Sequence, residues 1–215
     1  MRTRSLLFAG LLFFALSVHG ELLDRIAITV GQDVITEQQI YEQLRIAAFL
    51  NGAKPEFTQE KLRETADRMV MQRLVMQDMR ANGYPLPTEE EVEDALKQSR
   101  QANWGSREAF LKAARDAGLP ERALKDFLNK MVATAKYIDF RFRPAVRVSD
   151  SAVLERYQSK YNPLDPKGGE PPPYEDVKQA LEDEIADEQL EGVMDSWLED
   201  ARARAGVRYK PEVIP

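Results

Sequence analysis

Apolar and polar residues alternate over residues 25–30, and this period of two predicts a β-strand near the start of the chain. A turn follows, and residues 34–35 continue the extended pattern. Thr36 is then a suitable helix N-cap, because Gln39 stands three residues later and completes a capping box. The chain is therefore predicted to open with extended segments and a helix that ends at residues 51–52.

Beyond this point apolar residues recur at helical spacing, so we expect a mainly α fold. Capping residues, glycines and prolines divide the pattern into helices over about 58–82, 88–105, 106–118, 120–140, 149–161 and 174–205. Residues 207–209 form a short strand that we expect to pair with residues 25–30, which gives a small β pairing between the two chain ends. At ~1.5 Å per residue the last helix is about 45 Å long. This length favours an elongated multi-helix shape with an open concavity.

Residues 162–173 interrupt the helical pattern, because they contain five prolines and two glycines. Such a composition fits neither a helix nor a central strand, so we predict a linker. The chain then divides into an N-terminal helical domain at 21–161 and a segment at 174–215 that packs on it. The run 171–173 could be a polyproline ligand, although a stiff spacer is the commoner use.

Residues 1–20 have the three parts of a secretory signal peptide. Arg2 and Arg4 supply the positive start, residues 6–18 form an apolar run, and Gly20 ends a small-residue cleavage motif. The apolar run has 13 residues, whereas a helix that spans a membrane needs about 20. We therefore expect export with cleavage after Gly20, and no membrane insertion of the product.

The chain has no cysteine, and its single histidine, His19, lies in the predicted leader. The exported chain would lack a histidine base, a thiolate, and any histidine or cysteine ligand for zinc or iron. No Gly-x-x-x-x-Gly-Lys phosphate loop occurs, so we expect a binding protein rather than an enzyme, without a cofactor. The net charge of −6 becomes two units more negative when Arg2 and Arg4 are removed, which disfavours nucleic acid as a partner.

Four methionines lie close together in the helix predicted at 58–82. They could form an adaptable apolar surface for peptides, or they could be ordinary core. Met69 and Met76 share one helical stripe and are predicted to be core, whereas Met71 and Met79 lie off that stripe and are groove candidates.

Aromatic and other apolar residues elsewhere could line the same concavity, because rings give a large contact area at a small entropic cost. The full set of candidate peptide-binding residues is Met71, Met79, Phe110, Phe127, Met131, Tyr137 and Met194. Trp197 could join them, but it continues an apolar stripe and is predicted to dock the last helix on the N-terminal part. The stripe of that helix slips before Leu190, which indicates either a change of packing partner or a kink near Gly192.

Acidic residues gather at 89–93 and at 182–191, and could be interpreted as catalytic carboxylate pairs or as calcium ligands. Neither cluster has the spacing of an EF-hand loop, and both fall on predicted helix faces. We interpret both as solvated helix faces and predict no metal site. The first cluster also complements the positive N-terminus of its helix.

Three stretches of the chain, in this order, carry a resemblance to a known family. The first is an opening strand, turn and helix, with Asp24–Val30, Val34–Thr36 and Ile40. The second is a short helix, a glycine turn and a longer helix, with Asn103, Ser106, Glu108–Leu111, Gly118, Leu119, Phe127 and Leu128. The third consists of Val148–Asp150, Tyr157, Tyr161, Tyr174–Val177, Trp197 and Leu198. Together they resemble the SurA-like periplasmic chaperones, over nearly all of the chain after the leader.

Members of that family usually have Asn at the position of Gly31, and both residues suit a turn. They also carry a parvulin prolyl isomerase domain of about a hundred residues, where this chain has only 162–173. The parvulin site depends on histidines, so the resemblance implies no isomerase activity here.

The resemblance implies an ATP-independent periplasmic chaperone, or holdase. The clients that the resemblance implies are nascent exported proteins, those of the outer membrane above all. We expect their unfolded, apolar-aromatic segments to bind in a cradle between the second, fifth and last helices. The alternative is a structural or adaptor protein that uses the same fold to hold one folded partner. The sequence leaves open whether the chain is a monomer or a homodimer, and whether a separate partner supplies an isomerase.

Overall fold

The computed structural model describes residues 24–161 and 171–214. In this part of the chain, seven α-helices and a short 3-10 helix accompany a three-stranded antiparallel sheet, which confirms the mainly α fold with a small β pairing. The predicted leader and most of the predicted linker lie outside the described residues. No described helix combines the length and apolar composition needed to cross a membrane.

The sheet joins the two ends of the described chain. Strand β1 (Ile26–Val30) lies in the centre, between β2 (Asp33–Thr36) and β3 (Arg208–Tyr209). Both neighbours run antiparallel to β1, and Ile28 lies opposite Tyr209. The predicted pairing of the chain ends is therefore confirmed.

Side-chain caps start most of the helices, because each cap accepts a hydrogen bond from a backbone N–H of the first turn. Thr36, Thr58, Thr88, Ser106 and Ser149 fill this role. The helices are α1 (Glu37–Leu50), α2 (Gln59–Asn82), α3 (Glu89–Asn103), α4 (Arg107–Asp116), α5 (Glu121–Arg141), α6 (Asp150–Lys160) and α7 (Tyr174–Ala205), with the 3-10 helix η1 at Arg143–Ala145. One detail differs from the prediction: the helix expected over 120–140 begins at Glu121, and Pro120 is its extended N-cap.

The body of the molecule contains two apolar clusters. One joins the inner face of the sheet to α1, α2 and the end of α7, with Ile28, Ile40 and Val70 at its centre. The other joins the end of α1 to α3, α4 and the start of α5, with Phe49 and Phe110 among its members. The two ends of the described chain therefore share one core.

A third cluster, which we call the junction, lies where α2, α5 and α7 meet. Its buried members are Val75, Met79, Ala133, Tyr137, Phe142 and Leu190. The Tyr137 ring contacts Trp197 of α7 at 5.2 Å between ring centroids and Phe142 at 5.5 Å. The Tyr137 hydroxyl donates a hydrogen bond of 2.7 Å to Asp78, so the one polar group of this ring is satisfied.

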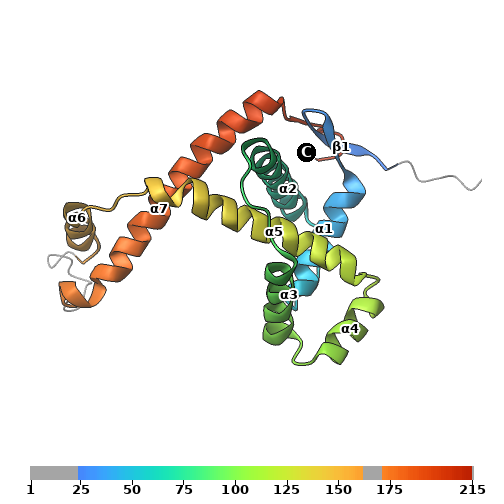
Figure 1. Cartoon of the computed structure of the whole chain (residues 1–215), viewed down its shortest axis with the longest axis horizontal. Coiled ribbons are helices and arrows are strands. Elements are labelled where there is room, and N and C mark those ends of the chain that lie inside the picture. The colour runs from blue at the N-terminus through green and yellow to red at the C-terminus, as the bar shows by residue number, and fades with distance from the viewer. Residues whose placement is uncertain (1–23, 162–170, 215) are drawn as a thin grey trace, which may run out of the picture.

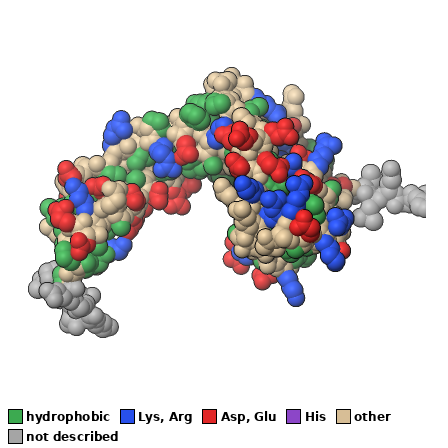
Figure 2. Space-filling view, turned by 60° about the horizontal axis from the view of Figure 1, so that its bottom comes forward, with side chains coloured by type: hydrophobic (Ala, Val, Ile, Leu, Met, Phe, Trp, Pro, Cys, Tyr) green, Lys and Arg blue, Asp and Glu red, His purple; other side chains and the backbone are tan. Residues whose placement is uncertain are grey.

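Helix α6 and the first half of α7 form an arm that projects from the body (Figure 1). The arm has its own small core of Val153, Leu181 and Ile185. Arg156 of α6 binds Glu184 and Glu188 of α7 at 2.7 and 2.6 Å, which fixes the two helices side by side. In the space-filling view, arm and body form an arch (Figure 2), so the elongated shape expected from the sequence is present.

Helix α7 changes its packing partner twice along its length. Leu181 and Ile185 belong to the arm, Leu190 to the junction and Ala201 to the sheet cluster. The slip of the apolar stripe before Leu190 therefore coincides with a change of packing partner.

The contact between α2 and β3 should depend on pH. Burial and a hydrogen bond from its hydroxyl to Asp67 raise the pKa of Tyr209 to about 12. A folded-state pKa above the unfolded value of about 10 gives stability that is complete below pH 10 and is lost as the pH rises towards 12. Tyr209→Phe should therefore lower the free energy of unfolding by about 1 kcal/mol at neutral pH, and by progressively less between pH 10 and 12.

Urea unfolding followed by circular dichroism, from neutral pH to pH 12, measures the difference in the free energy of unfolding between the unchanged chain and Tyr209→Phe. Tyr41→Phe is the matched control, because within the described residues the Tyr41 hydroxyl makes no hydrogen bond; at neutral pH it should change stability by no more than about 0.5 kcal/mol. A Tyr209→Phe difference that stays constant up to pH 12 would contradict the assignment.

Candidate functional site

Four of the seven predicted peptide-binding residues are core residues. Met79 and Tyr137 have no exposed surface, and Phe110 and Phe127 are 1% and 4% exposed. Met79 and Tyr137 fill the junction, whereas Phe110 and Phe127 pack between α1, α3, α4 and α5. These side chains have no surface for a ligand to contact, and the structure does not bring the seven residues together at one site.

The other three predicted residues keep accessible surface. Met131 on α5 is 46% exposed. Met71 and Met194 are partly buried and pack against the junction. Their role in binding stays a prediction.

The cradle expected between α2, α5 and α7 is occupied by protein. The rings of Tyr84, Tyr137, Phe142 and Trp197 pack there with centroid distances of 5.2 to 5.7 Å. Aromatic rings at these distances leave no space for a further side chain among them, so the pockets lie around this cluster, each between two of the three helices. The accessible concave surface instead lies on the outside of the junction.

A shallow pocket of about 500 Å³ lies between α5 and α7; we call it the acidic hollow. Its apolar lining comes from Ala135, Ile138, Leu190 and Met194. Its charged lining consists of Asp139, Arg143, Asp187, Glu191 and Asp195, so carboxylates dominate. The side chain of Arg143 binds Asp139 at 2.8 Å, and this hydrogen bond raises the pKa of Arg143 above its ordinary value.

A second pocket of about 420 Å³, the outer hollow, lies against the same part of α7. Val146, Gly192 and Val193 supply its apolar surface, and Ala145, Gln189 and Ser196 complete it. The two hollows share no residue, and residues of α7 between 187 and 196 line one hollow or the other in turn. This stretch of α7 is therefore accessible on two sides.

The acidic clusters are only in part the solvated faces expected from the sequence. Glu91 and Glu93 of α3 bind Lys136 and Lys125 of α5 at 2.7 and 2.8 Å. The hydrogen bonds from these lysines lower the pKa of both carboxyl groups. The cluster on α3 thus helps to hold α3 against α5, as Glu184 and Glu188 hold α7 against α6.

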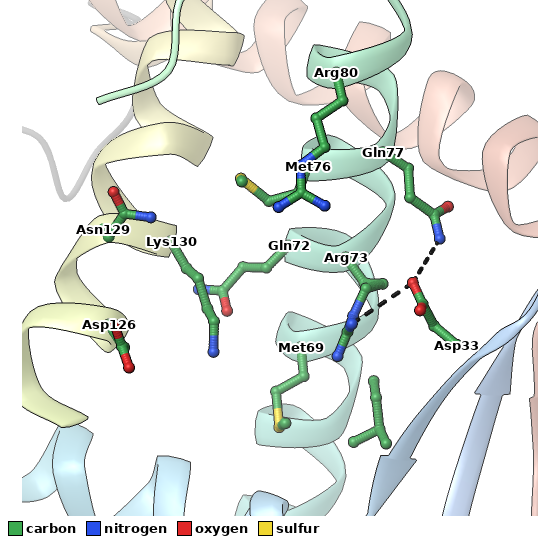
Figure 3. Close-up of a pocket in the computed structure, with 11 residues that line it drawn as sticks. Asp33, Met69, Gln72, Arg73, Met76, Gln77, Arg80, Asp126, Asn129 and Lys130 are labelled. Carbon is green, nitrogen blue, oxygen red and sulfur yellow. Dashed lines mark hydrogen bonds and ion pairs between the residues drawn. The ribbon is translucent and has the colours of Figure 1, made fainter. Parts of the chain in front are cut away.

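The sequence analysis did not identify a third pocket, of about 380 Å³, between β2, α2 and α5; we call it the basic pocket (Figure 3). Met69 and Met76, which were predicted to be core, line it together with Arg73, Gln77 and Arg80. These residues share one side of α2, so a recurring mixture of methionine, arginine and glutamine at helical spacing was the available signal. Within the described residues, no three acidic or metal-binding side chains form a cluster that could hold a metal ion.

Comparison of the sequence with models of known protein families and with curated proteins gives no match.

Gly192 allows a direct test of how open the middle of α7 is. A Cβ atom added at Gly192 would meet no other atom within 4 Å. Since alanine is favoured over glycine inside a helix, Gly192→Ala should raise the free energy of unfolding by about 0.5–1 kcal/mol, measured by chemical denaturation.

Gly83→Ala is the control, because a Cβ there would also meet nothing but the residue has a positive φ of 68°. It should lower stability by about 1 kcal/mol. A loss of stability in Gly192→Ala would show that α7 is covered at this point.

Proposed function

We propose that this protein is an ATP-independent holdase of the SurA-like type, without prolyl isomerase activity, that acts on unfolded exported polypeptides in the periplasm. The resemblance of its three sequence stretches to that family supports the proposal. The observation that carries it is the stretch of α7 at 187–196, which is accessible on two sides through hollows with apolar floors.

The lining of the acidic hollow suits a transient partner. Ile138, Leu190 and Met194 offer apolar contacts, and the methionine side chain adapts to different shapes. The hollow is shallow, so only a few client side chains would be buried at a time. Because affinity depends on how much apolar surface leaves water, binding of this kind is weak and reversible.

The charged rim gives the interaction a second component. Asp187, Glu191 and Asp195 surround the apolar floor, and Asp139 lies opposite them on α5. Acidic side chains also lie along the arch in Figure 2. Such a rim attracts basic client segments and repels acidic ones, and added salt should weaken both effects.

The shape of the molecule also supports a holdase. The arm and the body both border the concave side of the arch (Figure 1). The two hollows lie against the middle of α7, where Leu190 and Met194 pack at the junction. A client segment on α7 would be held away from other clients without being enclosed. No nucleotide is needed for release, because weak binding is reversible by itself.

Aggregation of an unfolded outer-membrane β-barrel protein without ATP tests the proposal. Near-stoichiometric amounts of the exported chain should suppress aggregation. Ala135→Glu and Val193→Glu should each weaken the suppression about fivefold, because each places a charge on an apolar contact surface. Both residues are exposed, so the fold should persist.

Matched controls are Ala102→Glu on α3 and Leu154→Glu on α6, which are exposed and lie outside both hollows. They should suppress aggregation like the parent chain. Equal effects of all four variants would contradict the proposed surface. No suppression for several unrelated clients, together with a stoichiometric complex with one folded protein, would support the dedicated adaptor instead.

A further inference from the structure

The basic pocket shares no residue with either hollow, and its chemistry is different. It lies between β2, α2 and α5 and has a volume of about 380 Å³. Its lining residues are Asp33, Ile35, Met69, Gln72, Arg73, Met76, Gln77, Arg80, Asp126, Asn129 and Lys130. A volume in this range holds one or two amino-acid residues of a ligand.

Both carboxylates of the pocket have partners of their own. Asp33 accepts a hydrogen bond of 3.0 Å from Gln77 and lies 3.6 Å from Arg73. Asp126 lies 3.8 Å from Arg122, on the preceding turn of the same helix. Arg73, Arg80 and Lys130 therefore share the pocket with two carboxylates, of which Asp33 is paired with Arg73, in a chain whose net charge is negative.

Lys130 of α5 is a half-buried cation of the pocket that has no ion pair among residues 24–161 and 171–214. Within the described residues, no carboxylate oxygen lies within 4.0 Å of its amine. Burial and the facing charge of Arg73 lower the pKa of Lys130, while Asp126 and Glu42 oppose this effect. An anion placed between Lys130 and Arg73 would relieve the repulsion between them.

Gln72 supplies an unused hydrogen-bonding group. This residue is only 5% exposed, yet its side chain forms no hydrogen bond within the described part of the chain. In Figure 3 it extends from α2 towards Lys130 on the opposite wall. The polar atoms of this amide are not buried, so a ligand that both donates and accepts hydrogen bonds can reach them from the pocket.

The remaining wall is apolar. Met69 and Met76 point into the space between α2 and α5 in Figure 3. Ile35 of β2 also lines the pocket. A free phosphate ion would leave this wall without a contact. A ligand that fits the whole pocket carries an anionic group, an amide and an apolar side chain close together.

We propose that the basic pocket binds the C-terminal residue of a polypeptide. The terminal carboxylate lies between Lys130, Arg73 and Arg80, where charge-assisted hydrogen bonds are strongest. The amide of Gln72 pairs with the peptide backbone, and the terminal side chain lies against Met69 and Met76. An internal Asp or Glu fits less well, because its only side chain carries the carboxylate. No apolar side chain of the same residue is then left to contact Met69 and Met76.

This proposal goes beyond the holdase function and does not depend on it, because the two sites share no residue. The test uses the full exported chain and a fluorescent peptide that ends in leucine with a free carboxylate. Fluorescence anisotropy should show binding, and the same peptide with an amidated C-terminus should bind about tenfold more weakly. An amidated peptide with an internal Asp should bind as weakly as the plain amide.

Lys130→Met should weaken binding of the free-acid peptide about tenfold and leave the amidated peptide unchanged. It should not lower the unfolding temperature, because it removes a partly buried charge without an ion pair. Lys97→Met, an exposed lysine on α3 outside the pocket, is the matched control and should change neither value.

Equal binding of the acid and amide peptides, or no effect of Lys130→Met, would overturn the proposal. Competition by inorganic phosphate as effective as that of unlabelled free-acid peptide would also overturn it and indicate a simple anion site. Lys130→Met should keep full suppression of client aggregation. If the unchanged protein binds the acid and amide peptides equally, only the proposal for the basic pocket is contradicted. If the unchanged protein does not suppress aggregation, only the proposed holdase function is contradicted.

Discussion

Tyr137 of α5 and Trp197 of α7 pack ring against ring with centroids 5.2 Å apart, and this contact determines where α7 leaves the body. The Tyr137 hydroxyl is held by Asp78 of α2, which also lies 3.4 Å from Arg141. Contacts of one buried side chain therefore hold α2, α5 and α7 together. Because α7 is a single helix from Tyr174 to Ala205, fixing it at this point places both the arm at its start and the strand that follows it. The sheet completes the arrangement by pairing the two chain ends.

The same junction decides where a client can bind. Its aromatic rings fill the point where α2, α5 and α7 meet, so the pockets lie around this point and on either side of α7. The floor of the acidic hollow includes Leu190 and Met194, which also pack against the junction from outside. A rigid core directly behind a shallow apolar surface suits weak binding of many segments, because the surface is formed before a client arrives. The basic pocket lies on a different side of α5 and offers a charge-based contact instead.

The helices and most of their ends could be predicted from the sequence, because caps such as Thr36 and Thr88 act within one turn. The candidate site could not be predicted from the sequence, because helical periodicity shows which residues share one side of a helix but not what packs against that side. Met79, off the main stripe of α2, meets α5 and α7 and is buried, while Met69 and Met76 on the stripe line the basic pocket. The burial of Phe110 and Phe127 could not be predicted for a related reason, because a large aromatic residue fits a core as well as a peptide groove.

Site-specific photo-crosslinking to an unfolded client tests the central claim most directly, which is that clients bind along α7 beside the junction. A photoreactive side chain at Val193 should capture several unrelated unfolded clients, whereas the same group at Leu154, which is similarly exposed on α6, should capture few. Added salt should reduce capture of basic clients. Equal capture from both positions, or capture of one folded protein only, would contradict the account.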